Sequence, residues 1–307
     1  MSKGQPIELK GKNGHYKFDP AQSLNLHGRF GSVFKGVDLT HGSRVVVKYY
    51  HARRGNQAAE FRFKAEALYA FGRPDIQDSL DFIDNGEGLF LIKRYIPGKT
   101  LKETKTDKVS FAQWKAVLSA LCDTLEFLHR KEIVHADIKP ANILWPGTGN
   151  GEPALPVLID FGLARWKKLT YTDSLYSFIY SPPEQVLGFT ELMGPASDLF
   201  ALGTTVYESL TGEPPYGGAE RTALEQAQLA APLPPHDALP ADWYALLAYL
   251  CEKPDFRQPY AQYSKEEQRR LVRESLERRP KGADEIKKRV SVLSTDHKRK
   301  SKWNIFG

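Results

Sequence analysis

The chain has 307 residues, of which 41% are hydrophobic and 26% are charged, and its formal net charge is +6 at pH 7. This is the composition of an ordinary globular protein able to bury a sizeable core. No segment approaches the ~20 uninterrupted apolar residues of a membrane span, and residues 1–13 are too polar for a signal peptide. Cys122 and Cys251 lie in apolar helical contexts without a metal-ligand pattern, so we expect buried free thiols and a reducing, cytoplasmic location.

Three elements are predicted before the middle of the chain. The β-branched run at residues 45–48 predicts a buried strand that ends in a lysine. Residues 63–68 recur at helical spacing and predict a helix that ends before the break at residues 72–74. The apolar periodic segment at residues 118–128 predicts a second helix.

The next stretch, His135-Ala136-Asp137-Ile138-Lys139-Pro140-Ala141-Asn142, carries the chemistry. It precedes the strand-like residues 142–145, so we expect a loop held at both ends by buried elements. Phosphoryl transfer needs a carboxylate to orient the attacking hydroxyl, a cation near the phosphate and oxygen ligands for magnesium. Asp137, Lys139 and Asn142 can fill these roles in that order. The alternative interpretation is that Asp, Lys, Pro and Asn are simply common turn residues.

A short strand is predicted at residues 157–159, and Asp160-Phe161-Gly162 follows it directly. The turn-rich residues 146–153 come before this strand and provide the connection that a hairpin would need. In this order, the two motifs resemble the catalytic loop and the D-F-G motif of the eukaryotic-type (Hanks-type) serine/threonine protein kinases. The resemblance implies an α+β, bilobal protein-kinase-like fold with a small β-rich N-lobe and a larger helical C-lobe. It divides the chain into an N-terminal extension, an N-lobe, a C-lobe and a basic C-terminal tail, at residues 1–15, 16–97, 98–286 and 287–307.

The resemblance also implies that the chain binds ATP together with Mg²⁺ or Mn²⁺. Asp160 and Asn142 would hold the metal, and Lys48 would hold the α- and β-phosphates. Asp137 would accept or orient the proton of the substrate hydroxyl, and Lys139 would stabilise charge on the transferring group. The glycine-containing loop, the hinge and the apolar surface around adenine would complete the nucleotide site with Gly28, Phe30, Gly31, Val33, Val46, Tyr95, Ile96 and Leu144.

Lys48 should pair with a glutamate on the following helix, and both Glu60 and Glu66 are candidates. We favour Glu66, because it lies among residues that recur at helical spacing. Lys93 is unusual, because it stands at the gatekeeper position of the expected hinge, residues 90–98. An unpaired buried ammonium is costly, so Lys93 must find a partner, turn outward or shift its charge. The alternative is that the assigned register is one residue off.

Two positions depart from the family pattern. Leu26 stands where the glycine-rich loop normally has its first glycine, but Gly28 and Gly31 still allow a tight hairpin and we expect ATP binding to survive. Ala136 replaces the arginine that in the family reads a phosphate on the activation segment. We therefore expect activity that does not depend on phosphorylation of residues 160–184.

Serine and threonine are the expected acceptors. Lys139 lies two residues after Asp137, and Ser177 lies three residues before Tyr180, where serine/threonine kinases carry a hydroxyl that bonds to the aspartate and the lysine. The segment then ends in Pro182-Pro183-Glu184, which resembles the A-P-E motif.

Glu184 should form a buried salt bridge with either Arg257 or Arg279. We favour Arg257, because its distance after Asp198 is closer to that of a minimal kinase lobe, and the chain beyond Tyr260 would then be an extra helical tail. Asp198 opens a predicted helix, where its carboxylate can cap free N–H groups and also pin the backbone of the catalytic loop.

The expected function is transfer of the γ-phosphate of ATP to serine or threonine hydroxyls of a protein substrate. A nucleotide-binding pseudokinase scaffold and a small-molecule phosphotransferase of the same fold are the alternatives. The retained Lys48, Asp137, Asn142 and Asp160 argue against the scaffold, and the segments at 182–184 and 198 argue against the small-molecule enzyme. The basic tail is expected to be solvated. The alternative is that it binds an anionic partner, which would be nucleic acid, an anionic membrane surface or an acidic protein.

Overall fold

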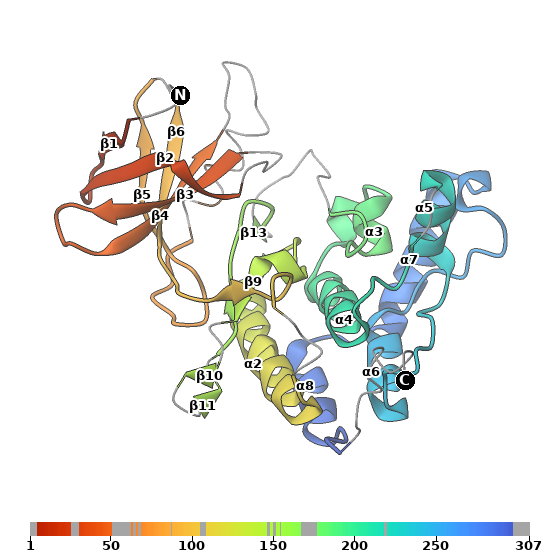
Figure 1. Cartoon of the computed structure of the whole chain (residues 1–307). Coiled ribbons are helices and arrows are strands. Elements are labelled where there is room, and N and C mark those ends of the chain that lie inside the picture. The colour runs from red at the N-terminus through yellow and green to blue at the C-terminus, as the bar shows by residue number, and fades with distance from the viewer. Residues whose placement is uncertain are drawn as a thin grey trace. The chain divides into compact units, whose positions relative to one another are not determined.

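A computed structural model describes residues 5–25, 31–50, 63, 66, 69–86, 88–104, 109–145, 148–149, 152–153, 155–166, 177–217 and 220–296. The chain divides into two compact units. The first comprises residues 1–97 and 159–163, and the second comprises residues 98–158 and 164–307. The first is rich in strands and the second in helices (Figure 1), which confirms the predicted division into a β-rich and a helical part.

The described part of the first unit contains a six-stranded antiparallel sheet with the strand order β1-β2-β3-β4-β6-β5. Its strands are β1 (Ile7–Lys10), β2 (His15–Asn25), β3 (Gly31–Asp38), β4 (Arg44–Tyr50), β5 (Ser79–Asp84) and β6 (Leu89–Arg94). Residues 63 and 66 are helical. The sheet buries a core of Leu9, Tyr16, Phe18, Phe34, Val45, Val47, Ile83, Phe90 and Ile92.

Three polar side chains of β4 and β6 share one face of the sheet. Val46 lies opposite Lys93 and Lys48 lies opposite Leu91 in the antiparallel register. Because directly opposed residues and every second residue of a strand share a face, Lys48, Lys93 and Tyr50 project from the same side of the sheet. Apolar neighbours bury both strands, so these polar groups must find partners inside the protein.

The predicted N-terminal extension, residues 1–15, contains a strand of the sheet. Residues 7–10 form β1, which pairs with residues 15–18 of β2 as a hairpin. Leu9 and Tyr16 are both buried in the sheet core, so the predicted boundary at residues 15 and 16 cuts through a packed element. The alternating burial of a short edge strand is a weak signal in sequence, because two of its four residues are charged.

The second unit contains the helices α2 (Phe111–Arg130), α3 (Pro183–Val186), α4 (Pro195–Thr211), α5 (Arg221–Ala230), α6 (Ala241–Leu250), α7 (Lys265–Arg278) and α8 (Ala283–Ser291). Helix α2 begins with a capping box between Ser110 and Gln113, and its apolar face is buried. Helix α4 has Pro195 in its first turn and ends at Gly212, whose positive φ of 84° suits glycine. Helices α2 and α8 pack together, as do α4 and α6.

Short strands hold the loops of this unit. A three-stranded sheet joins β7 (Lys99–Thr100), β9 (Ile143–Trp145) and β12 (Val157–Leu158), and β8 (Ile133–Val134) pairs with β13 (Arg165–Trp166). The predicted strands at 142–145 and 157–159 are therefore paired, with the small hairpin of β10 (Thr148–Gly149) and β11 (Glu152–Pro153) between them. Three-residue 3-10 helices lie at Pro140–Asn142 (η2), Thr190–Leu192 (η3) and Tyr260–Gln262 (η4).

The predicted C-terminal tail, residues 287–307, begins inside helix α8 (Ala283–Ser291). Helix α8 continues to Ser291 and buries Ile286 and Val290, while Leu293 beyond it is buried as well. The Leu293 carbonyl accepts a hydrogen bond from Lys115 Nζ at 3.1 Å. The basic residues of this segment are the outer face of a packed helix, and the rest of the expected tail, residues 297–307, lies outside the described residues.

Both cysteines are free and buried, as predicted. Burial raises the pKa of each thiol to about 12. Among the described residues, no helix combines the length and the apolar character that a membrane crossing requires.

Candidate active site

The second unit holds the stretch from His135 to Asn142 through its backbone. The buried Asp198 of α4 accepts hydrogen bonds from the amides of His135 and Ala136, both at 2.9 Å, and His129 Nε2 lies 2.9 Å from the same carboxylate. Ala136 has a positive φ of 62°, which is uncommon for a residue other than glycine. The predicted pinning role of Asp198 is therefore present. Asp198 lies in the first turn of α4, and at the start of this helix Ser197 Oγ accepts from the amide of Gly194.

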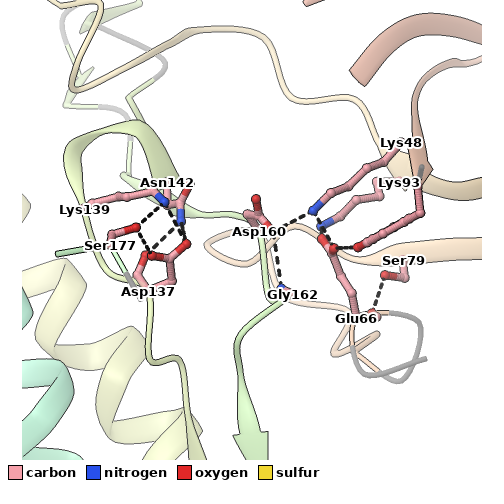
Figure 2. A network of polar contacts seen from close by, with 11 residues as sticks. Lys48, Glu66, Ser79, Lys93, Asp137, Lys139, Asn142, Asp160, Gly162 and Ser177 are labelled. Carbon is pink, nitrogen blue, oxygen red and sulfur yellow. Dashed lines mark hydrogen bonds and ion pairs between the residues drawn. The ribbon is translucent and has the colours of Figure 1, made fainter. Parts of the chain in front are cut away.

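The Asp137 carboxylate lies at the centre of a polar network (Figure 2). Ser177 Oγ donates to Oδ1 at 2.6 Å, and Lys139 Nζ donates to Oδ2 at 2.8 Å. Lys139 Nζ also donates to Ser177 Oγ at 2.8 Å, which closes a triangle among the three side chains. Asp137 itself is buried. The hydroxyl and the ammonium therefore fix the carboxylate in one orientation.

Asn142 reaches the same carboxylate from the 3-10 turn that follows. Its Nδ2 donates to the backbone carbonyl of Asp137 at 2.8 Å and to Asp137 Oδ2 at 2.9 Å. Pro140 suits the first position of this turn, since it has no amide hydrogen to satisfy. Because the amide nitrogen points to Asp137, the amide oxygen points away from it. Lys139, Asn142 and Ser177 thus converge on Asp137, and the contacts of Ser177 with Asp137 and Lys139 are those that the resemblance implied.

The first unit contains a separate cluster around Glu66, whose side chain is fully buried. Lys48 Nζ lies 2.7 Å from Glu66 Oε2 and 2.6 Å from Asp160 Oδ1 (Figure 2). The predicted pairing of Lys48 with Glu66 is therefore present, and Glu60 lies outside the described residues. Lys93 also has a partner, because its ammonium donates to Glu66 Oε1 inside the protein. Of the outcomes considered for Lys93, the structure shows an internal ion pair.

The electrostatics of this cluster favour the charged forms. Burial by itself lowers the pKa of Lys48, but the carboxylates of Asp160 and Glu66 outweigh it and raise that pKa well above its usual value. Burial likewise raises the pKa of Glu66, but Lys48 and Lys93 outweigh it and the pKa is lowered. The Tyr50 hydroxyl also donates to Glu66, and burial raises the pKa of Tyr50 well above its usual value. Glu66 is thus an anion held by two cations and one hydroxyl.

Asp160 is held in a strained backbone conformation, with a positive φ of 60°. The Gly162 amide donates to Asp160 Oδ1 at 3.3 Å, and a Cβ on Gly162 would lie 3.1 Å from that same oxygen. Phe161 is fully buried and its ring packs against Tyr69 and Phe71, with centroid distances of 5.2 and 6.3 Å. The apolar anchor at Phe161 therefore fixes the backbone from which the Asp160 carboxylate projects.

Asp160 of the first unit and Asn142 of the second each carry an oxygen of the kind that binds a hard divalent cation. Magnesium prefers carboxylate, carbonyl and phosphate oxygens, and it is bound by one or two protein carboxylates rather than a full protein cage. The carboxylate of Asp160 and the amide oxygen of Asn142 are both donors of this kind. The Asp160 side chain keeps 38% of its surface exposed, so a metal can reach it.

The predicted nucleotide residues lie in both units. Within the first unit, Gly31 and Val33 lie on β3, Val46 lies on β4, and Tyr95 and Ile96 follow β6. Leu144 belongs to β9 of the second unit, and Gly28 and Phe30 lie outside the described residues. Gly31 is required locally, because a Cβ there would collide with the Tyr49 carbonyl oxygen on the paired strand.

The preference for Arg257 as the partner of Glu184 is wrong. Arg279 Nη1 lies 2.9 and 3.0 Å from the two carboxylate oxygens of Glu184, and both side chains are fully buried. The Arg257 side chain is 85% exposed, and its ion pair among the described residues is with Asp255 at 3.6 Å. The residues beyond Tyr260 are therefore not an extra tail, because α7 carries the chain to the arginine that this buried glutamate requires.

The sequence-based prediction left out two contributors to these contacts, Tyr50 and Gln185, and did not identify the partner of a third, Lys93. Tyr50 lies two residues after Lys48 on the same strand face, so the period of the strand could have indicated it. Lys93 was noticed, but its partner depends on the pairing of β4 with β6. Gln185 Nε2 donates to the Ala136 carbonyl at 2.9 Å, and no local pattern marks this contact.

Comparisons with known proteins agree with this geometry. The family model described as the protein kinase domain matches residues 27–290. Serine/threonine-protein kinase Pkn1 of Myxococcus xanthus is 32% identical over 243 residues, which cover 75% of this chain and 35% of that protein. Serine/threonine-protein kinase PknA of Mycobacterium tuberculosis is 31% identical over 245 residues, which cover 75% of this chain and 54% of PknA. The probable serine/threonine-protein kinase PknB of Bifidobacterium longum is 29% identical over 275 residues, 81% of this chain and 38% of that protein.

The chain thus spans between 35% and 54% of the length of these curated relatives. The family match includes both motifs that carry the resemblance, at residues 135–142 and 160–162, and it covers most of the chain. The chain belongs to the protein kinase domain family.

Proposed function

We propose that the chain is an ATP-dependent serine/threonine protein kinase that transfers the γ-phosphate of ATP to a hydroxyl of a protein substrate. The observation that carries this proposal is the triangle of Asp137, Lys139 and Ser177. It presents a carboxylate whose orientation is fixed and a lysine ammonium beside it, which are the groups that a hydroxyl attacking a phosphate requires. The curated relatives carry names of serine/threonine kinases, which agrees with this acceptor class.

Each side chain has a role in the proposed reaction. Asp137 orients the acceptor hydroxyl and receives its proton, while Lys139 stabilises the negative charge on the transferring group. Lys48, held by Glu66, binds the α- and β-phosphates of ATP. Mg²⁺, or Mn²⁺ in its place, would be held by Asp160 and Asn142 and would neutralise charge on the phosphates. The Ser177 hydroxyl positions Asp137 and Lys139 with respect to each other.

The ordered polar network argues for a transferase over a scaffold that only binds nucleotide. Asp137 is buried with three side-chain donors, although an unneeded buried carboxylate is costly to retain. The Ser177 hydroxyl contacts both the Asp137 carboxylate and the Lys139 ammonium. These contacts support transfer of phosphate to serine or threonine of a protein. Ser177 belongs to the same segment, residues 160–184, that ends at Glu184.

The test is a transfer assay with radiolabelled ATP and a generic basic protein. Asp137→Asn and Asp160→Asn keep the shape of each side chain and should each lower the transfer rate by a factor of about 10² or more. Asp255→Asn is the matched control, because Asp255 is exposed and should leave the rate unchanged. Transfer at the parent rate by either of the first two variants would contradict the assignment.

Ser177 provides a second test within the same network. Ser177→Ala removes the hydroxyl between Asp137 and Lys139 and should lower the rate by about tenfold, whereas Ser177→Thr keeps a hydroxyl and should retain most of it. Equal rates for the alanine and threonine variants would show that the hydroxyl does not position the two catalytic groups.

We further propose that activity does not require phosphorylation of the segment 160–184. Ala136 stands where an arginine would receive the phosphate, and only its backbone is engaged, through Asp198 and Gln185. The side chain at this position is a buried methyl group and offers no charge-assisted donor. Protein treated with phosphatase should transfer phosphate at the rate of the untreated protein, to within about twofold. A large loss of rate after dephosphorylation would contradict this proposal.

A further inference from the structure

The Glu66 carboxylate is bound from two neighbouring strands at once. Lys48 of β4 donates to Oε2 and Lys93 of β6 donates to Oε1 (Figure 2). The Tyr50 hydroxyl of β4 also donates to Oε2. Its main chain is held as well, since Ser79 Oγ of β5 donates to the Glu66 carbonyl at 2.8 Å. The side chain of Glu66 is fully buried and that of Lys93 is 3% exposed. Glu66 is therefore fixed to the sheet by contacts that do not involve Lys48.

The charges of the cluster balance only when Lys93 is counted. Lys48 and Lys93 contribute two positive charges, and Glu66 and Asp160 contribute two negative charges. Lys48 is shared, because its ammonium contacts both carboxylates. In a buried site, removing the charge of Lys93 would leave one uncompensated negative charge. Lys93 thus supplies the cation that Glu66 needs when Lys48 is engaged elsewhere.

This division matters for a lysine that binds phosphate. In the proposed reaction, Lys48 must turn its donors toward ATP, and its contribution to holding Glu66 then falls. Tyr50 and Lys93 contact Glu66 from positions set by the β4–β6 register, with Lys93 opposite Val46. A carboxylate held in this way remains beside Lys48 before and during phosphate binding. Glu66 can then orient Lys48, because Tyr50 and Lys93 hold Glu66 in place when Lys48 also interacts with phosphate.

We propose that Lys93 and Tyr50 are positioning residues for phosphoryl transfer, which hold Glu66 in place so that Glu66 can orient Lys48. This inference rests on the proposed kinase function and goes beyond the Lys48–Glu66 pair. It assigns a task to the buried lysine at position 93, and it states that the task is performed through Glu66 and not by contact with the nucleotide.

The test is a double-mutant cycle between positions 93 and 66, with kcat and the KM for ATP measured separately. Lys93→Met should lower kcat/KM by a factor of about 10 to 100, since small displacements of positioning groups have effects of this size. In the Glu66→Gln background, the same substitution should cost less than about threefold, because a residue acting through Glu66 has little left to position. Lys93→Arg keeps the cation and should recover most of the rate.

Two further variants keep the test decisive. Lys17→Met removes an exposed lysine of the same sheet that pairs with Glu8 at 2.9 Å, and it should not change either constant. Tyr50→Phe removes only the hydroxyl and should lower kcat/KM by severalfold, again with less effect in the Glu66→Gln background. If Lys93→Met fails to fold, the cycle between Tyr50→Phe and Glu66→Gln tests the same role. The Lys93→Met/Glu66→Gln protein, which lacks both buried charges, is then compared with Glu66→Gln.

Equal losses from Lys93→Met in the parent and in the Glu66→Gln background would overturn the inference, as would full activity of Lys93→Met. Calorimetric titration with magnesium-ATP separates this outcome from failure of the proposed function. A parent protein that binds ATP but transfers no phosphate would contradict the kinase proposal alone. In that case weaker ATP binding by Lys93→Met, with the same dependence on Glu66, would still support the positioning role, and unchanged binding would reject it.

Discussion

Replacing Arg279 by methionine tests the buried ion pair that the structure assigns in the second unit. Arg279 makes two contacts with the Glu184 carboxylate, donates through Nε to the Glu252 carbonyl at 2.6 Å, and lies over the Phe200 ring at 4.9 Å. Methionine keeps part of the packing against Phe200 but removes every donor. Glu184 would then be a fully buried carboxylate with Ser197 Oγ, at 2.7 Å, as its remaining contact among the described side chains.

The expected cost follows from leaving a charge buried without its partner. Removing one member of a buried pair destabilises a protein by about 3–5 kcal/mol. In a unit of this size, each kcal/mol shifts the melting temperature by about 2–4 °C, so a decrease of roughly 6–20 °C is expected. Arg257→Met is the matched control: its side chain is 85% exposed, and it should cost less than about 0.5 kcal/mol.

Differential scanning calorimetry and urea unfolding would measure both variants. Glu184→Gln/Arg279→Met removes the buried charge with its partner and should be less destabilised than the sum of its two single variants. A cost below about 1 kcal/mol for Arg279→Met, or an equal cost for Arg257→Met, would refute the reasoning, because burial would then not determine the strength of the pair.

Three further predictions concern buried titratable groups. Lys253 has no ion-pair partner among the described residues; it donates to the Ala227 carbonyl at 2.9 Å and lies 3.5 Å from the centre of the Tyr216 ring. Burial lowers its pKa well below the usual value, so Lys253→Met should raise the unfolding free energy at pH 7 in urea titrations, and an unchanged or lower value would contradict this. Cys122 and Cys251, with pKa values of about 12, should resist iodoacetamide at pH 8 in the native protein and react after denaturation, whereas rapid native labelling would indicate exposure. The pKa of Glu66 is lowered in the folded protein, so its ion pairs contribute stability that is fully present above the ordinary pKa of 4.5 and is lost as the pH falls through the folded-state pKa. Glu66→Gln should therefore reduce the dependence of the unfolding free energy on pH in the acid range. An unchanged dependence would argue against the ion pairs.

The local motifs were readable in the sequence because their geometry depends on short spacing. Asp137, Lys139 and Asn142 lie within six residues, so any loop that places a 3-10 turn after Lys139 brings the amide of Asn142 back to the carboxylate. Helix α2 was likewise predicted within its true bounds, because its apolar residues recur at helical spacing. These features required no knowledge of how distant elements pack.

The errors arose where two distant residues compete for one partner. Arg257 and Arg279 both lie in segments that resemble the family pattern, and sequence distance favoured the wrong one. The packing of α7 decides the pair, because it buries Arg279 beside Glu184 and leaves Arg257 exposed. The predicted limits at residues 15 and 287 fall inside packed elements for a similar reason, since a polar composition hid apolar positions that pair or pack with other elements.

The fold class, the family resemblance and the catalytic groups from Asp137 to Asn142 were therefore predictable from the chain alone, because motif spacing and hydrophobic period are local properties. Packing between distant elements selects the arginine that neutralises Glu184 and the carboxylate that pairs with Lys93. The physical reason is that a buried charge is stable only with a partner, and the identity of that partner depends on the register of β4 with β6 and on the packing of α7.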